Sequence, residues 1–100
     1  MIEKTIKGIK YRLDEDALTA EVIQKRNYEG DIIVPEVVVL KKISYRVTSI
    51  GEGAFSDCTS ISSIVIPDSV TTIGDYAFYN CSALTAITIP NSVKIGRAHV

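Results

Sequence analysis

A tandem repeat of 23 residues constrains the fold of this chain more than any other feature of its sequence. Segments 47–69 and 70–92 align without a gap, and 11 of their 23 positions are identical. Most other positions exchange similar residues, such as Glu52 for Asp75 or Ile61 for Leu84. A repeat of this length is typical of solenoids, in which each unit buries its apolar face only against the next unit.

Each repeat contains two apolar patterns. The pattern I-x-x-I-x-I-P, from Ile61 to Pro67 in the first unit, alternates at its end and predicts a half-buried strand. Proline cannot donate a hydrogen bond to a neighbouring strand, so the strand is expected to end there. The pattern I-G-x-x-A-F-x-x-C, from Ile50 to Cys58, has steps of three and four residues and predicts a short helix or 3₁₀ turn with one buried stripe.

Together these patterns resemble the BspA-like leucine-rich repeat, also called the Treponema pallidum type. In that family the strand ends in IP and the chain continues as V-x-x-I-G-x-x-A-F-x-x-C. The resemblance covers residues 47–93 and implies a short α/β leucine-rich-repeat solenoid with an N-terminal β-rich cap. The matching residues are Val47, Ile50, Gly51, Ala54, Phe55, Cys58, Ile64, Ile66, Pro67, Val70, Ile73, Gly74, Ala77, Phe78, Cys81, Ile87, Ile89 and Pro90.

The N-terminal segment, residues 1–46, is expected to form the cap together with a degenerate first repeat. Apolar and polar residues alternate over 6–13 and again over 18–23, which predicts a hairpin. Residues 31–38 echo the end of the repeat strand, and the lysines at 41–42 are expected to turn a second small hairpin.

The remaining boundaries follow from the repeat register. We expect leucine-rich repeats at 47–69 and 70–92 and an atypical tail at 93–100. The register requires two residues between Val93 and the next Ile-Gly pair, but only Lys94 is present. The sequence Ile-Gly-Arg-Ala-His-Val at 95–100 can be read as the translation of a common sequencing-adapter sequence. We therefore interpret the tail as an artefact, with a naturally diverged C-terminus as the alternative.

Composition excludes several classes of protein. Hydrophobic residues make up 46% of the 100 residues and charged residues 23%, which is inconsistent with wholesale disorder. The net charge of −1 argues against a dedicated nucleic-acid binder. No apolar run approaches the ~20 residues of a membrane-spanning helix, and the first five residues lack the apolar core of a signal peptide.

Solenoids need about three repeats and capped ends for independent stability. We therefore expect a fragment of a longer surface protein, whose uncapped C-terminal edge is open to self-association.

The sequence predicts no catalytic residue, cofactor or metal. The only histidine is His99, so triads that need a histidine base have no candidate outside the tail. Gly51-Glu52-Gly53 is better explained as a turn than as a phosphate loop. The acidic run Asp14-Glu15-Asp16 lacks the spacing of a calcium loop and is expected to be a solvated hairpin turn.

The two cysteines, Cys58 and Cys81, are one repeat apart. They should stack on adjacent coils about one strand spacing apart, near the low end of the Cα separation that a disulfide tolerates. Buried thiols are the favoured interpretation, and a disulfide in an oxidising compartment is the alternative. Two cysteines supply too few ligands for a zinc site.

The resemblance implies that the strands line a concave face. Its outward-pointing residues are expected to be Ser63 and Val65 in one repeat and Ala86 and Thr88 in the next, and they form the candidate partner-binding surface. This face is small, neutral and only weakly polar.

Two further groups of side chains are expected at the surface. Tyr76 and Tyr79 flank Phe78 and are candidate exposed aromatic anchors for a partner. A basic and aromatic spot combines Lys41–Lys42 with Tyr45 and Arg46, but a solvated hairpin explains it better.

The resemblance also implies a function. It points to a non-catalytic protein- or glycan-binding repeat module of a bacterial adhesin that is secreted or held at the cell surface. The ligand would be a protein or glycan on a host or neighbouring cell. The alternative is a structural spacer or scaffold region of a larger cell-surface protein.

Overall fold

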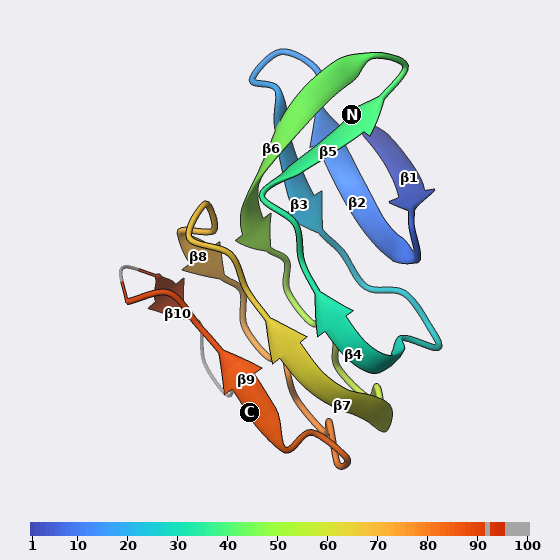
Figure 1. Cartoon of the computed structure of the whole chain (residues 1–100), viewed down its shortest axis with the longest axis vertical. Coiled ribbons are helices and arrows are strands. Elements are labelled where there is room, and N and C mark those ends of the chain that lie inside the picture. The colour runs from blue at the N-terminus through green and yellow to red at the C-terminus, as the bar shows by residue number, and fades with distance from the viewer. Residues whose placement is uncertain (92, 96–100) are drawn as a thin grey trace.

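The computed structural model describes residues 1–91 and 93–95, and within these ranges it consists of strands and turns (Figure 1). Strand pairing divides the strands into two sheets, one of seven strands and one of three. The strands are β1 (Ile2–Ile6), β2 (Ile9–Asp14), β3 (Thr19–Val22), β4 (Glu29–Ile33), β5 (Val37–Leu40), β6 (Ile43–Ile50), β7 (Ser60–Val65), β8 (Thr72–Ile73), β9 (Ala86–Thr88) and β10 (Lys94–Ile95).

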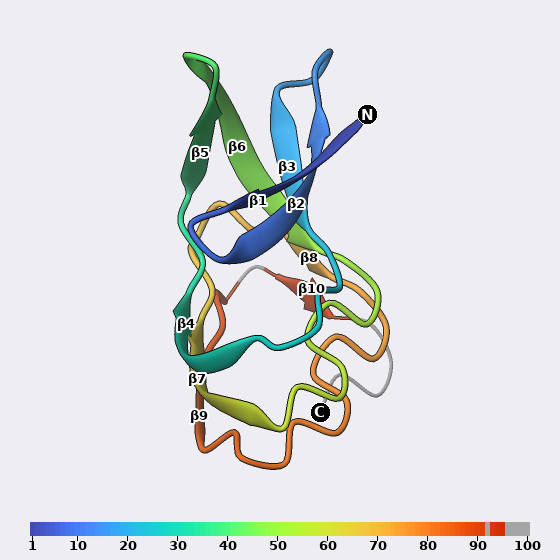
Figure 2. The ribbon, with the colours of Figure 1, turned by 90° about the vertical axis from the view of Figure 1, so that its right-hand side faces the viewer.

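Both sheets run from the cap into the repeats. The larger sheet has the order β1-β2-β3-β6-β8-β10, and β5 pairs with β6 beside this path. The smaller sheet, β4-β7-β9, is parallel throughout. Figure 2 shows β4, β7 and β9 stacked along one side of the repeats, with the turns that precede β7 and β9 stacked along the opposite side.

The cap contains the two predicted hairpins and one that was not predicted. Strands β2 and β3 pair antiparallel, and β5 and β6 pair around a turn at Lys41–Lys42. The alternation at 6–13 was expected to form a single strand, but a turn at Lys7-Gly8 divides it into β2 and the added strand β1. Both turn residues have left-handed backbone angles, φ 49° and 88°, as tight two-residue hairpins require.

The helical part of the predicted α/β solenoid is wrong for the residues that the structure describes, because these contain no helix. In the segment 52–57 the amides of Gly53, Phe55 and Asp57 donate to carbonyls of the next repeat, at 2.8–2.9 Å. An α-helix would direct them to carbonyls four residues earlier in the same segment. The intervening amides of Ala54, Ser56 and Cys58 instead close local turns over three residues.

An aromatic stack runs through the core of the repeats. The rings of Tyr28 and Phe55 lie 5.1 Å apart, and those of Phe55 and Phe78 lie 5.8 Å apart and nearly parallel. Both phenylalanines are fully buried, which confirms the inward orientation of the Ala-Phe pair. Tyr28 comes from the cap, so this stack joins the cap to both repeats.

Gly74 lies where adjacent coils come closest. A Cβ atom at this position would be 2.6 Å from the backbone nitrogen of Glu52 in the preceding coil. No side chain fits at that distance, so glycine is required for the coils to stack at this point.

Strand β10 accommodates the slip in the repeat register. Lys94 pairs with Thr72 and Ile95 with Ile73, an offset of 22 residues, whereas β6 and β8 are offset by 23. Lys94 and Ile95, two residues of the tail that the sequence analysis interprets as an artefact, thus occupy the strand position of a further repeat. Residues 96–100, on which the rest of that interpretation depends, lie outside the described residues.

Candidate functional site

The four candidate partner-binding residues lie together on the small sheet. Ser63 pairs with Ala86, and Val65 pairs with Thr88 in the parallel register of β7 and β9. Alternate residues of a strand point to opposite faces, so all four side chains share the face turned away from the core. Val65, Ala86 and Thr88 are exposed, and Ser63 is half-buried.

Strand β4 extends this face by two residues that the sequence analysis did not name. Asp31 pairs with Ser63, and Ile33 pairs with Val65. The hydroxyl of Ser63 donates a hydrogen bond of 2.7 Å to the carboxylate of Asp31. Ile33 is 69% exposed, against 38% for Val65 beside it. We call these six residues the strand face.

A sequence signal for the two missed residues was present. Residues 31–38 echo the end of the repeat strand, and continuing that alignment makes Asp31 equivalent to Ser63 and Ile33 equivalent to Val65. In the sequence analysis this similarity predicts only a degenerate repeat. The candidate surface there contains outward residues of the two regular repeats alone, so Asp31 and Ile33 were missed.

Tyr76 and Tyr79 belong to the turns that precede β9. This segment lies on the opposite side of the repeats from β4, β7 and β9 (Figure 2). The two tyrosine rings contact edge to face with centroids 5.8 Å apart, and they are 47% and 51% exposed. The predicted exposure is therefore confirmed. The two tyrosines form a separate aromatic corner and do not join the strand face.

Both cysteines are free thiols. Cys58 is buried and Cys81 half-buried, and the Cys81 thiol donates to the carbonyl of Phe55 at 3.0 Å. Burial raises the pKa of both thiols, so they are protonated at neutral pH. A protonated, buried thiol is a poor nucleophile and a poor metal ligand.

The charged residues of the cap form turns and exposed ion pairs. Arg12 bridges Glu3 and Glu21 on the exposed face of the cap sheet, at 3.2 and 3.4 Å. The Asp14 carboxylate accepts hydrogen bonds from the amides of Asp16 and Ala17, which is the arrangement of a solvated turn.

The basic and aromatic spot near the second hairpin does not assemble. Lys41, Lys42 and Arg46 are exposed, whereas Tyr45 is buried in the core. Within residues 1–91 and 93–95, no group of three or more histidine, cysteine, aspartate or glutamate side chains could hold a metal ion.

The described part of the chain also has no helix with the length and apolar character needed to cross a bilayer.

Comparison with known proteins identifies the repeat. Residues 38–99 match the family described as BspA type leucine-rich repeat region (6 copies). None of the curated proteins matches the sequence.

Several solved structures have the same fold. A leucine-rich repeat protein from Bacteroides ovatus is 39% identical over 90% of this chain, with a TM-score of 0.83. A leucine rich cell surface protein from Faecalibacterium prausnitzii is 33% identical over 99% of the chain, with a TM-score of 0.81. The T. pallidum leucine rich repeat protein, 24% identical over 94%, has a TM-score of 0.74 and is similar in fold.

This chain is short beside these relatives. It spans 24% of the B. ovatus protein, 27% of the F. prausnitzii protein and 42% of the T. pallidum protein.

Proposed function

Because the chain belongs to the BspA-type leucine-rich repeat family, we propose that it is a non-catalytic binding module of a bacterial surface protein. The strand face is the proposed contact surface, and its partner is a protein or a glycan on another cell or in the surrounding matrix. The observation that carries the proposal is the parallel register that aligns outward side chains from β4, β7 and β9.

The chemistry of the strand face supports this role. Neighbouring strands are about 4.8 Å apart, so the face presents evenly spaced side chains on a rigid support. Its Ile33 and Val65 offer apolar contact area, while Asp31, Ser63 and Thr88 offer hydrogen-bonding groups. A mixed surface of this kind is common in protein interfaces.

Two comparisons between the repeats also support it. The inward residues of the strands are the same in both units, Ile64 with Ile87 and Ile66 with Ile89. The outward residues differ, with Ser63 replaced by Ala86. Packing therefore accounts for the constant positions and leaves the outward ones available for a partner.

Localisation at the cell surface is part of the proposal. It rests on the F. prausnitzii relative, which is described as a cell surface protein, and on membership of the family.

The test is binding to an array of matrix proteins and glycans, with two variants of equal charge. In the first, Ser63, Val65, Ala86 and Thr88 are all replaced by Lys. In the control, lysines replace four exposed residues outside the strand face, Thr59, Ser60, Ser82 and Ala83. The proposal predicts that the first variant loses binding to the array and that the control retains it.

Other outcomes would assign the role elsewhere. Equal loss in both variants would mean that added charge, not the strand face, abolishes binding. Loss after replacing Tyr76 and Tyr79 by Ala would move the contact surface to the aromatic corner. If no protein or glycan on the array binds, the second candidate function, a structural spacer or scaffold, is favoured. The small side chains of Ser63 and Ala86 are consistent with that role.

A further inference from the structure

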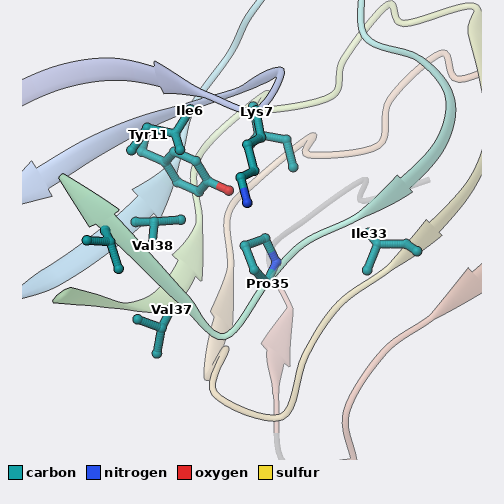
Figure 3. A pocket seen from close by; sticks show the side chains of 9 residues that line it. Ile6, Lys7, Tyr11, Ile33, Pro35, Val37 and Val38 are labelled. Carbon is teal, nitrogen blue, oxygen red and sulfur yellow. The ribbon is translucent and has the colours of Figure 1, made fainter.

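A pocket of about 310 Å³ lies beside the strand face, between the β1–β2 turn and the segment that joins β4 to β5 (Figure 3). Its volume is at the low end of the range for small-molecule sites. Most of the lining is apolar. The lining residues are Ile6, Lys7, Ile9, Tyr11, Ile33, Pro35, Val37, Val38 and Val39.

Tyr11 supplies one of the two polar side chains of this lining. The residue is only 1% exposed, yet its hydroxyl group forms no hydrogen bond with any residue in the described ranges. In Figure 3 the Tyr11 oxygen points toward Lys7. The oxygen atom itself is not fully buried, so it is free to donate a hydrogen bond to a ligand in the pocket.

The neighbouring tyrosine shows how unusual this is. The hydroxyl group of Tyr28, also buried, donates to the carbonyl of Ile23 and accepts from the amide of Lys10, both at 3.0 Å. The fold therefore satisfies one buried tyrosine completely and leaves the other directed at the pocket.

Lys7 supplies the second polar side chain. It lies in the β1–β2 turn, and its amino group points toward the Tyr11 oxygen in Figure 3. Lys7 forms no ion pair within residues 1–91 and 93–95. Burial raises the pKa of Tyr11 to about 12, so its hydroxyl group remains a neutral donor at physiological pH. The two side chains thus offer a cation and a hydrogen-bond donor to one anionic group.

We propose that this pocket binds a small amphipathic carboxylate, such as a medium-chain fatty acid. The carboxylate accepts hydrogen bonds from Lys7 and Tyr11, and the aliphatic chain packs against Ile6, Pro35 and Val37. Charged hydrogen bonds are the stronger class, which favours the carboxylate over a neutral alcohol of the same length. This site adjoins the strand face, with which it shares Ile33, but takes a different class of ligand from the proposed protein or glycan partner.

The test is titration of the 100-residue chain with octanoate, octan-1-ol and octylammonium, followed by NMR chemical shifts. We expect saturable shifts with octanoate at the pocket residues, and binding of octan-1-ol at least about tenfold weaker. Octylammonium is expected not to bind, since its charge repels Lys7. Equal binding of octanoate and octan-1-ol, or no saturable octanoate shift, would overturn the proposal.

Two substitutions and a matched control locate the site. Tyr11→Phe removes only the hydroxyl group, and Lys7→Met removes the ammonium group with its charge and hydrogen-bond donors. Each is expected to weaken octanoate binding by about fivefold to tenfold. Lys42→Met is the control, because Lys42 is also a left-handed residue of a hairpin turn, with φ 69°, but does not line this pocket.

A stability measurement separates binding from folding. Because the Tyr11 hydroxyl group has no partner in the described protein, Tyr11→Phe is expected to leave the melting temperature unchanged or raise it. A folded Tyr11→Phe protein that binds octanoate as tightly as the parent would contradict the proposal. So would octanoate-induced shifts confined to residues of the strand face.

Discussion

The two repeats are closely similar in sequence but are not equally buried. In their first halves, the main core residues are buried alike, as with Phe55 and Phe78. In their strand halves they differ, since Ile64 is 1% exposed and Ile87 is 37% exposed. Strand β7 lies between β4 and β9, whereas β9 is paired only with β7 among the described strands. Burial in this fold is therefore set by the coils on either side and not by the repeat sequence itself.

The largest expected effect is at the position where the two repeats agree. Phe55→Ala and Phe78→Ala should each lower the free energy of unfolding by about 3–5 kcal/mol, because both rings are buried in the aromatic stack. Chemical denaturation measures this loss. A Phe78 variant as stable as the parent would mean that the second repeat does not pack as the first does.

The next largest loss of stability is expected at a strand position that is buried in the first repeat and partly exposed in the second. Ile64→Ala should cost about 3 kcal/mol, because it leaves a cavity between β4 and β9. Ile87→Ala should cost about 1 kcal/mol, because much of that side chain already contacts solvent. Paired denaturation curves provide the comparison, and equal losses would contradict the difference in burial.

A third pair tests the close approach of the coils. A Cβ at Gly74 would be 2.6 Å from a backbone nitrogen, whereas at Gly51 its nearest contact would be 3.0 Å, to the Val22 carbonyl oxygen. Gly74→Ala should therefore destabilise the fold by about 2–3 kcal/mol and Gly51→Ala by about 1 kcal/mol. The melting temperatures of the two variants, measured against the parent, would show whether this order holds.

The smallest effect concerns the thiols and pH. Burial raises the pKa of Cys58 and Cys81 in the folded state above the unfolded value of 9.0. Their contribution to stability is thus complete below that value and is lost as the pH rises through the folded-state values. The free energy of unfolding of the parent should therefore fall as the pH rises above about 9. Replacing both cysteines by Ala should reduce the fall, and an unchanged slope would contradict it.

The alternation and spacing of apolar residues predicted those parts of the fold that depend on residues close together in the sequence. The strands at β7 and β9 and the inward orientation of Phe55 follow from alternation and spacing alone. Of the short helix or 3₁₀ turn predicted at 50–58, the helix was wrong, because every second amide donates to the neighbouring coil. Spacing of three and four residues fits a helix and a stacked turn equally well, and only contacts between repeats distinguish the two.

The candidate sites likewise divide into residues that the sequence predicts and a pocket that only the structure shows. Repeat register was enough to find Ser63, Val65, Ala86 and Thr88, which the structure brings onto one face. The pocket could not be found in this way, because Tyr11 and Ile33 are far apart in the sequence and line one pocket only once the cap has folded.

Thiol labelling would measure the difference in burial without depending on unfolding. In a protein with Cys58 and Cys81 replaced by Ala, a single cysteine is introduced as Ile64→Cys or Ile87→Cys, with Val65→Cys as the exposed reference. Ile87→Cys should react within about tenfold of the reference. Ile64→Cys should react at least about a hundredfold more slowly, because it reacts only after local opening. Similar rates at positions 64 and 87 would show that the neighbouring coils do not determine burial in these repeats.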